Sequence, residues 1–163
     1  MSSSFIKQES VQDSQKIENV KKKKKEKITS SKHEITLLPK EINNPSDVLY
    51  LYIDNKKLTR LPKEIGILKN LKNLTISYNQ ITELPKEIGS LINLEALFMN
   101  SNQLEKLPKE IDNLSNLLIL NVQSNQLTRF PKEIGILKNL KELNISYNQI
   151  TRLPKEIGNL KEL

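Results

Sequence analysis

The sequence lacks the residues on which most enzyme and metal sites depend. It contains no cysteine and a single histidine, His33. Disulfide bonds and thiolate metal ligands are therefore excluded, and no Cys-His or Ser-His-Asp site can be assembled around His33. There is also no Gly-Lys-Ser/Thr phosphate loop, no GxGxxG turn and no cluster with zinc-ligand spacing. These absences predict a protein that is not an enzyme and that uses no metal or cofactor.

Long apolar runs are missing as well. No segment approaches the roughly 20 consecutive apolar residues that a membrane-spanning helix needs. The first residues, Met1–Phe5, do not form the basic region followed by an apolar core that marks a secretory signal. The sequence therefore predicts a cytoplasmic protein.

Positive charge is concentrated near the N-terminus. The net charge of +7 divides into +4 for residues 1–37 (9 lysines minus 5 acids) and +3 for residues 38–163 (17 lysines and arginines minus 14 acids). Residues 1–27 contain too little apolar surface to fold and are predicted to be a disordered basic tail. The run Lys21–Lys27 is interpreted either as a solvated tail or as a targeting or adaptor patch for nucleic acid or an anionic membrane.

A five-residue signature, Leu-Pro-Lys-Glu-Ile, recurs at a constant interval of 23 residues. It begins at Leu38, Leu61, Leu84, Leu107, Phe130 and Leu153, with phenylalanine replacing leucine once. A fixed period of this length indicates a solenoid, in which each unit buries its apolar face only by stacking on its neighbours. Function is therefore expected to reside on the surfaces of the stack.

Each repeat combines two kinds of local structure. Leu74 and Ile76 are two residues apart, which places both on one side of a short strand, whereas Asn73, Thr75 and Ser77 face the other side. The segment 62–66 has proline where a first helical turn accepts it and glycine where a turn ends, so a short 3₁₀ or one-turn helix is predicted there. Successive strands are expected to form a parallel sheet about 4.8 Å apart.

An asparagine follows each predicted strand at the same position of four repeats. These residues are Asn79, Asn102, Asn125 and Asn148. A buried amide offers two donors and an acceptor, so each side chain is predicted to bridge the turns above and below it. The role expected for this column is structural.

The pattern Leu71-x-x-Leu74-x-Ile76-x-x-Asn79-x-Ile81, preceded by Leu61-Pro62-x-x-Ile65-Gly66, resembles the 23-residue leucine-rich repeats of intracellular Ras-signalling scaffolds, plant proteins and short bacterial proteins. The resemblance implies an α/β solenoid with a parallel sheet on its concave face, short helical turns on its convex face, and a role in protein–protein recognition and signalling. The predicted domain is 28–163, with a degenerate cap at 28–37, five full repeats at 38–152 and a partial repeat at 153–163.

Three residues depart from this pattern. Lys56 occupies the asparagine position of the first full repeat, where we do not expect a regular amide contact. Asp112 and Asn43 replace the turn glycine. Because both residue types tolerate a left-handed backbone, the turn is expected to survive.

The outward strand positions form the candidate binding surface. Few of them are charged and several are aromatic, which is the composition of an interface centre. We interpret Phe98 as solvent-facing, and we leave open whether Tyr78 and Tyr147 pack against neighbouring turns. The predicted partner-binding residues are Tyr50, Tyr52, Asn73, Thr75, Phe98, Asn100, Asn121, Gln123 and Asn144. The expected ligand is a partner protein, not a small-molecule substrate.

The last signature is not followed by a strand of its own. Leu153, Ile157, Leu160 and Leu163 should cover the preceding turn with nothing packed beyond them. We therefore expect weak self-association through this C-terminal edge.

Overall fold

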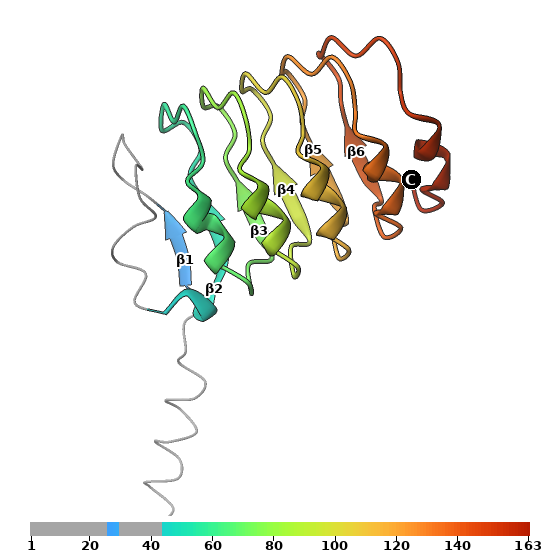
Figure 1. Ribbon diagram of the computed structural model, residues 1–163. Coiled ribbons are helices and arrows are strands. Elements are labelled where there is room, and N and C mark those ends of the chain that lie inside the picture. Colours follow the sequence, from blue (N-terminus) through green and yellow to red (C-terminus); the bar gives the residue numbers. More distant parts are fainter. Residues whose placement is uncertain (1–25, 30–43) are drawn as a thin grey trace, which may run out of the picture.

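The computed structural model describes residues 26–29 and 44–163, which form one continuous solenoid (Figure 1). Each turn of the solenoid contains one short strand and one 3₁₀ helix. The strands are β1 (Glu26–Thr29), β2 (Val48–Tyr52), β3 (Asn73–Thr75), β4 (Ala96–Phe98), β5 (Ile119–Asn121) and β6 (Glu142–Asn144). The 3₁₀ helices are η1 (Pro45–Asp47), η2 (Lys63–Ile67), η3 (Lys86–Ser90), η4 (Lys109–Asn113), η5 (Lys132–Ile136) and η6 (Lys155–Asn159).

The strands form a single parallel sheet in chain order, β1 to β6. The register advances by 23 residues at each step, so that Leu51, Leu74, Leu97, Leu120 and Leu143 stand side by side. Ile28 pairs with Leu51 in the same way, which confirms that the period continues back to this residue. β1 begins at Glu26, two residues before the domain boundary expected from the sequence.

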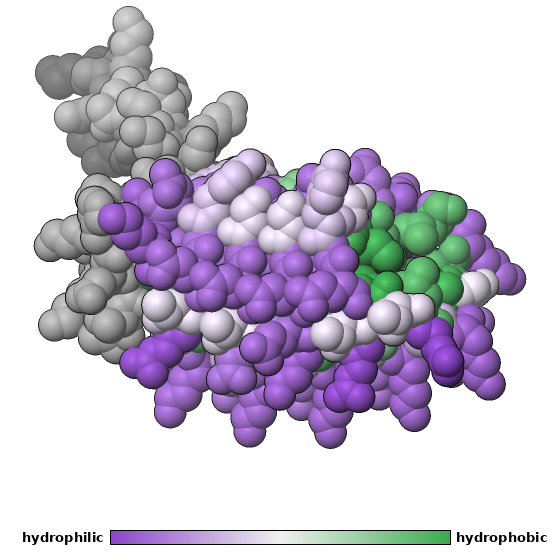
Figure 2. Space-filling view, turned by 90° about the horizontal axis from the view of Figure 1, so that it is seen from above, coloured by the Kyte–Doolittle hydropathy of each residue, from purple (hydrophilic) through white to green (hydrophobic). Residues whose placement is uncertain are grey.

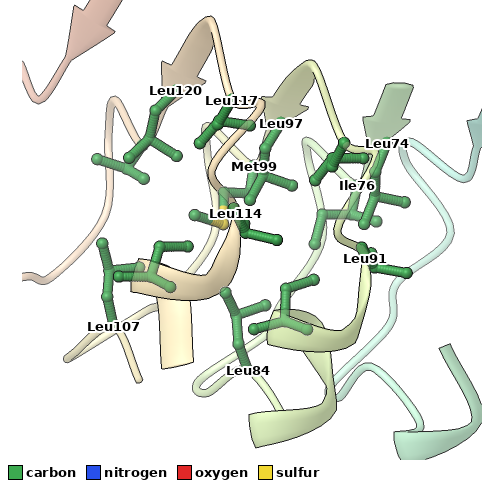
Figure 3. Close-up of a cluster of buried hydrophobic side chains, with 14 of the residues drawn as sticks. Leu74, Ile76, Leu84, Leu91, Leu97, Met99, Leu107, Leu114, Leu117 and Leu120 are labelled. Atoms are coloured by element: carbon green, nitrogen blue, oxygen red, sulfur yellow. The ribbon is translucent and has the colours of Figure 1, made fainter. Parts of the chain in front are cut away.

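The apolar core lies between the sheet and the 3₁₀ helices. Figure 3 shows Leu74, Leu97 and Leu120 pointing inward from β3, β4 and β5. Opposite them, leucines beside the 3₁₀ helices, such as Leu91 and Leu114, complete each layer. All five of these side chains are fully buried. Because every layer contacts only the layers next to it, stability is expected to be a sum of nearest-neighbour terms.

The convex side is built from the Leu-Pro-Lys-Glu-Ile signature. Pro62 is the N-cap of η2, with an extended backbone (φ −70°, ψ 149°), and its carbonyl accepts a hydrogen bond from the N–H of Ile65 at 3.1 Å. Ile65 points into the core and is fully buried. The helix therefore begins one residue after the proline, and the short 3₁₀ element expected from the sequence is confirmed.

The expected reason for the turn glycine is wrong. No glycine of the described residues has a positive φ, and Gly66 lies within η2. The structure instead shows close packing between successive turns: a Cβ atom added to Gly89 would lie 2.5 Å from the carbonyl oxygen of Glu110. Asp112 fits in the glycine position with its side chain half-buried. Asn43 lies outside the described residues.

Candidate partner-binding face

The predicted binding residues lie together on the concave side of the sheet. Strand pairing arranges them in two rows. The first row, from β2 to β6, is Tyr50, Asn73, Ala96, Ile119 and Glu142, and the second is Tyr52, Thr75, Phe98, Asn121 and Asn144. A third row follows the strands and contains Asp54, Ser77, Asn100, Gln123 and Ser146. We call these three rows the concave face.

Side-chain hydrogen bonds join one repeat to the next along this face. Asp54 accepts hydrogen bonds from the hydroxyl of Thr75 (2.8 Å) and from the backbone N–H of Ser77 (2.6 Å). The Ser77 hydroxyl in turn donates to Oδ1 of Asn100 at 2.7 Å. Nearer the C-terminus, Nδ2 of Asn144 donates to Oε1 of Gln123 at 3.1 Å. The polar residues of the concave face are therefore held in place before any partner arrives.

Burial on this face depends on the size of each side chain. Phe98 keeps its outward strand position and is partly exposed, with the rest of its side chain covered by its neighbours. Ser77 and Ala96, at outward positions, are buried. The cause is the close spacing of strands in a sheet, about 4.8 Å, because larger side chains on either side cover a small residue between them. The small residues therefore form the floor of the face and the aromatic residues form its raised parts.

The asparagine column is confirmed, with a different direction of contact. Oδ1 of Asn102 accepts a hydrogen bond from the N–H of Ile81 at 3.0 Å. Its Nδ2 donates to the carbonyls of Ile76 (2.9 Å) and Met99 (3.2 Å). Ile76 and Ile81 belong to the preceding turn and Met99 to its own, so the amide reaches backward only, not to both neighbours. Asn79, Asn125 and Asn148 make the equivalent contacts.

A second asparagine column was not foreseen. Asn70, Asn93, Asn116 and Asn139 precede the strands at the same 23-residue interval. Each donates from Nδ2 to a carbonyl 24 residues earlier, at 2.8–2.9 Å, as Asn93 does to Lys69. The recurrence of asparagine at this position was the available signal. Because these side chains are more exposed than the first column, water competes for their partners and their contribution is smaller.

An ion pair lies at the edge of the sheet where the strands begin. Nζ of Lys72 donates to Oε1 of Glu95 at 2.6 Å, the only ion pair among the described residues. The hydrogen bond with Glu95, together with its negative charge, raises the pKa of Lys72 above its ordinary value. Both side chains are partly exposed, so this pair contributes little to stability. Beside it lies a shallow groove of about 320 Å³, lined in part by Asn93, Asn116 and Leu118.

The turns that follow β2 to β6 share one position with a left-handed backbone. Its φ lies between 54° and 57° at Asn55, Tyr78, Ser101, Ser124 and Tyr147. The turn after β2 has a second left-handed residue, Lys57, with a φ of 57°. The side chains of Tyr78 and Tyr147 are 62% and 78% exposed, so they do not pack against neighbouring turns. A bulky residue in this conformation costs of order 1–3 kcal/mol.

The C-terminal edge is apolar, as expected. Leu153 and Leu163 are 44% and 54% exposed, and Ile157 is half-buried. Leu160, in contrast, is buried, so the edge is not uniformly open. Figure 2 shows a hydrophobic surface at the end of the molecule opposite the residues of uncertain placement. Glu26 and Lys27, at the end of the lysine run, lie in β1 and not in a disordered tail. The rest of the lysine run and of the predicted tail lies outside the described residues.

A family model described as "Leucine-rich repeat region" matches residues 28–120 and 86–163. A solved structure of a leucine-rich repeat protein from Leptospira interrogans superposes with a TM-score of 0.71, at 46% sequence identity, over 72% of this chain. The chain spans 30% of the length of that protein. Among curated proteins no match was found. In the part of the chain that the structure describes, none of the helices has the length and apolar character to cross a membrane.

Proposed function

The chain belongs to the leucine-rich repeat family, and from this premise we propose that it is a non-catalytic module that binds a partner protein on the concave face. Domains of this family commonly mediate protein–protein interactions. The observation that carries the proposal is the arrangement of Tyr52, Thr75 and Phe98 in one row. The small Thr75 separates two aromatic side chains, and we propose that a partner's side chain inserts above it; we call this position the slot.

The chemistry around this slot supports the proposal. Aromatic residues enclosed by polar neighbours, few of which are charged, are typical of the energetically dominant centre of an interface. The hydrogen bonds from Thr75 to Asp54 and from Asn144 to Gln123 fix side chains in advance, which lowers the entropy lost on binding. Asn73 offers a further contact: its Oδ1 is buried without a hydrogen-bond partner, and rotation of the amide would present it to a donor on the partner.

A charge placed in the slot tests the proposal. The partner is captured from cell lysate with the wild-type protein, identified and then titrated in purified form. Phe98→Glu should weaken binding at least about 30-fold, the effect of losing an interface hot spot. Lys109→Glu, on the exposed convex side, introduces a glutamate elsewhere with a larger change of net charge, −2 against −1, and should leave the affinity unchanged. Equal binding by both variants, each with a native circular dichroism spectrum, would contradict the proposal.

Salt dependence separates this function from the electrostatic alternative. Binding at a face with few charges should change little between 50 and 300 mM salt, about the range over which exposed charges become screened. Binding through Lys21–Lys27 to nucleic acid or an anionic membrane should fall by orders of magnitude and disappear when residues 1–25 are deleted.

Two further proposals concern assembly and location. The exposed Leu153 and Leu163 support weak self-association through the C-terminal edge. Sedimentation equilibrium should detect dimers that Leu153→Glu abolishes, and a strictly monomeric mass would contradict this.

We also propose that the protein acts in the cytoplasm as a signalling scaffold. Asn73-Leu-Thr and Asn144-Ile-Ser match the acceptor sequence for N-glycosylation. In a secreted protein, glycans on these two residues would cover the concave face, which favours the cytoplasm. Fractionation of cells expressing the protein tests its location.

A further inference from the structure

Two tyrosines occupy backbone positions that suit smaller residues better. The left-handed turn residue is Asn55, Ser101 or Ser124 in three repeats and Tyr78 or Tyr147 in the other two. Asparagine is enriched in this conformation, whereas bulky side chains are rare in it. Both tyrosine side chains are largely exposed. These two positions therefore combine backbone strain with an aromatic ring that the core does not use.

The fold does not require a tyrosine at either position. The turn is held by main-chain hydrogen bonds: the N–H of Tyr78 donates to the carbonyl of Asn100 at 3.0 Å, and the N–H of Ser101 donates to that of Gln123 at 2.9 Å. The contact is the same whether the residue is tyrosine or serine. A strained backbone conformation whose side chain does not stabilise the fold is typical of ligand-binding positions.

The tyrosines lie on a rim that also carries unused hydrogen-bonding groups. Two residues after each turn position stands an exposed glutamine: Gln80, Gln103, Gln126 and Gln149. The backbone N–H of each is bonded to the preceding repeat. No side-chain hydrogen bond is seen for any of the four within the described parts of the chain. Because the asparagine between each turn residue and its glutamine points inward, both flanking side chains face solvent. We call this row the glutamine rim.

We propose that Tyr78 and Tyr147 are two anchor points for an extended peptide segment of a partner protein, which lies along the glutamine rim. The two residues are three repeats apart, or about 14 Å at a strand spacing of about 4.8 Å. Four residues of extended chain span the same distance, at about 3.4 Å each. Side chains at positions i and i+4 of such a peptide point to the same side, so each meets one tyrosine.

The residues between the anchors fit a main chain. Ser101 and Ser124 are small and leave room for the peptide between the two rings. The free amides of Gln103 and Gln126 offer a donor and an acceptor to its peptide groups. The partner is thus a segment with two large apolar or aromatic residues separated by three others. This site is separate from the slot at Phe98 and does not depend on the function proposed for the concave face.

A phage-displayed library of random 12-residue peptides tests the proposal with the full-length protein. Selection should enrich sequences with two apolar or aromatic residues four positions apart. A synthetic peptide of the enriched sequence should bind Tyr78→Asn and Tyr147→Asn at least tenfold more weakly than wild type. Asparagine already occupies the turn as Asn55, so both variants should unfold at the same or a higher temperature, which separates lost binding from lost folding.

Matched variants complete the test. Lys109→Glu and Ile136→Asn, both at exposed positions of the convex side, should each bind the peptide as wild type does. Failure to enrich spaced apolar pairs, or equal binding by the tyrosine variants, would overturn the proposal. Titration with cellohexaose, a neutral oligosaccharide that also stacks on aromatic rings, tests the alternative that the two tyrosines bind a glycan. Saturable binding of this sugar that both tyrosine variants lose, without peptide enrichment, would overturn the peptide in favour of a glycan.

Discussion

The central repeats and the last full repeat, which contains β6, have nearly the same sequence but different surroundings. Leu97 has a strand on each side and is fully buried, whereas Leu143, its equivalent in β6, pairs with β5 alone and is partly buried. Asn102 is buried, whereas Asn148 is not fully covered. The difference shows that the energetic value of a residue in this solenoid depends on its neighbours, not on its own repeat. Identical substitutions in the two regions should therefore have unequal effects.

The largest inequality is expected in the core. Leu97→Ala should lower the free energy of unfolding by about 3–5 kcal/mol, because the cavity is closed on all sides. Leu143→Ala should cost about half as much, since water reaches part of the site already. Urea denaturation followed by circular dichroism measures both. Equal losses would show that the last repeat is as tightly packed as the centre and would remove the basis of the comparison.

The next effect concerns the buried amides. Asn102→Ala leaves the N–H of Ile81 and the carbonyl of Ile76 without partners, and should cost about 2 kcal/mol. Asn148→Ala should cost less, because solvent can hydrate the groups that its side chain satisfies. Thermal unfolding at matched protein concentration checks the order. An unchanged melting temperature for Asn102→Ala would rule out a structural role for the column.

The glycines sharpen the same comparison. Gly89→Ala should destabilise by about 1 kcal/mol, because the new Cβ would meet the carbonyl of Glu110 in the next turn. Nothing lies within 4 Å of the corresponding atom at Gly158. Gly158→Ala should therefore be neutral, or stabilise by about 0.5 kcal/mol through the unfolded state. A loss of stability at Gly158 would mean that another surface covers this turn in solution.

The smallest effect is that of the Lys72–Glu95 pair. A raised pKa in the folded protein means that the contribution of Lys72 is complete below its unfolded pKa and is lost as the pH rises through the folded value. Lys72→Met should therefore differ slightly from wild type between pH 7 and 9. The difference should decline as the pH rises through the raised pKa of Lys72. Melting curves at several pH values would detect it, and a difference that grows with pH would contradict this account.

The repeat period was sufficient to predict most of the fold. Leu74 and Ile76 identified the buried side of the strand, Pro62 marked the start of the 3₁₀ helix, and the resemblance to leucine-rich repeats is confirmed. These features follow from the local sequence pattern of one repeat. Stacking then gives every repeat the same structure, because the strands pair in one constant 23-residue register. The packing role of the turn glycine could not be predicted, because the close approach of Gly89 to Glu110 joins residues of two successive turns, 21 positions apart in the sequence.

The surface was less predictable than the core. The outward direction of Tyr52 and Phe98 follows from strand alternation, but how far each is covered depends on the size of its neighbours in adjacent repeats. The strain at Tyr78 and Tyr147 was hidden for a different reason. A positive φ is usually signalled by glycine, and none of the six left-handed positions among the described residues contains one. Whether the predicted binding residues contact a partner remains a prediction.

The backward direction of the asparagine contacts has a consequence for how the chain is made. Each amide, on emerging from the ribosome, finds its partners in a turn that has already been synthesised. A new repeat can therefore lock onto the growing end at once, without waiting for sequence still to be translated. The contacts are therefore compatible with folding in the direction of biosynthesis, in which the exposed end would always be the most recently made repeat.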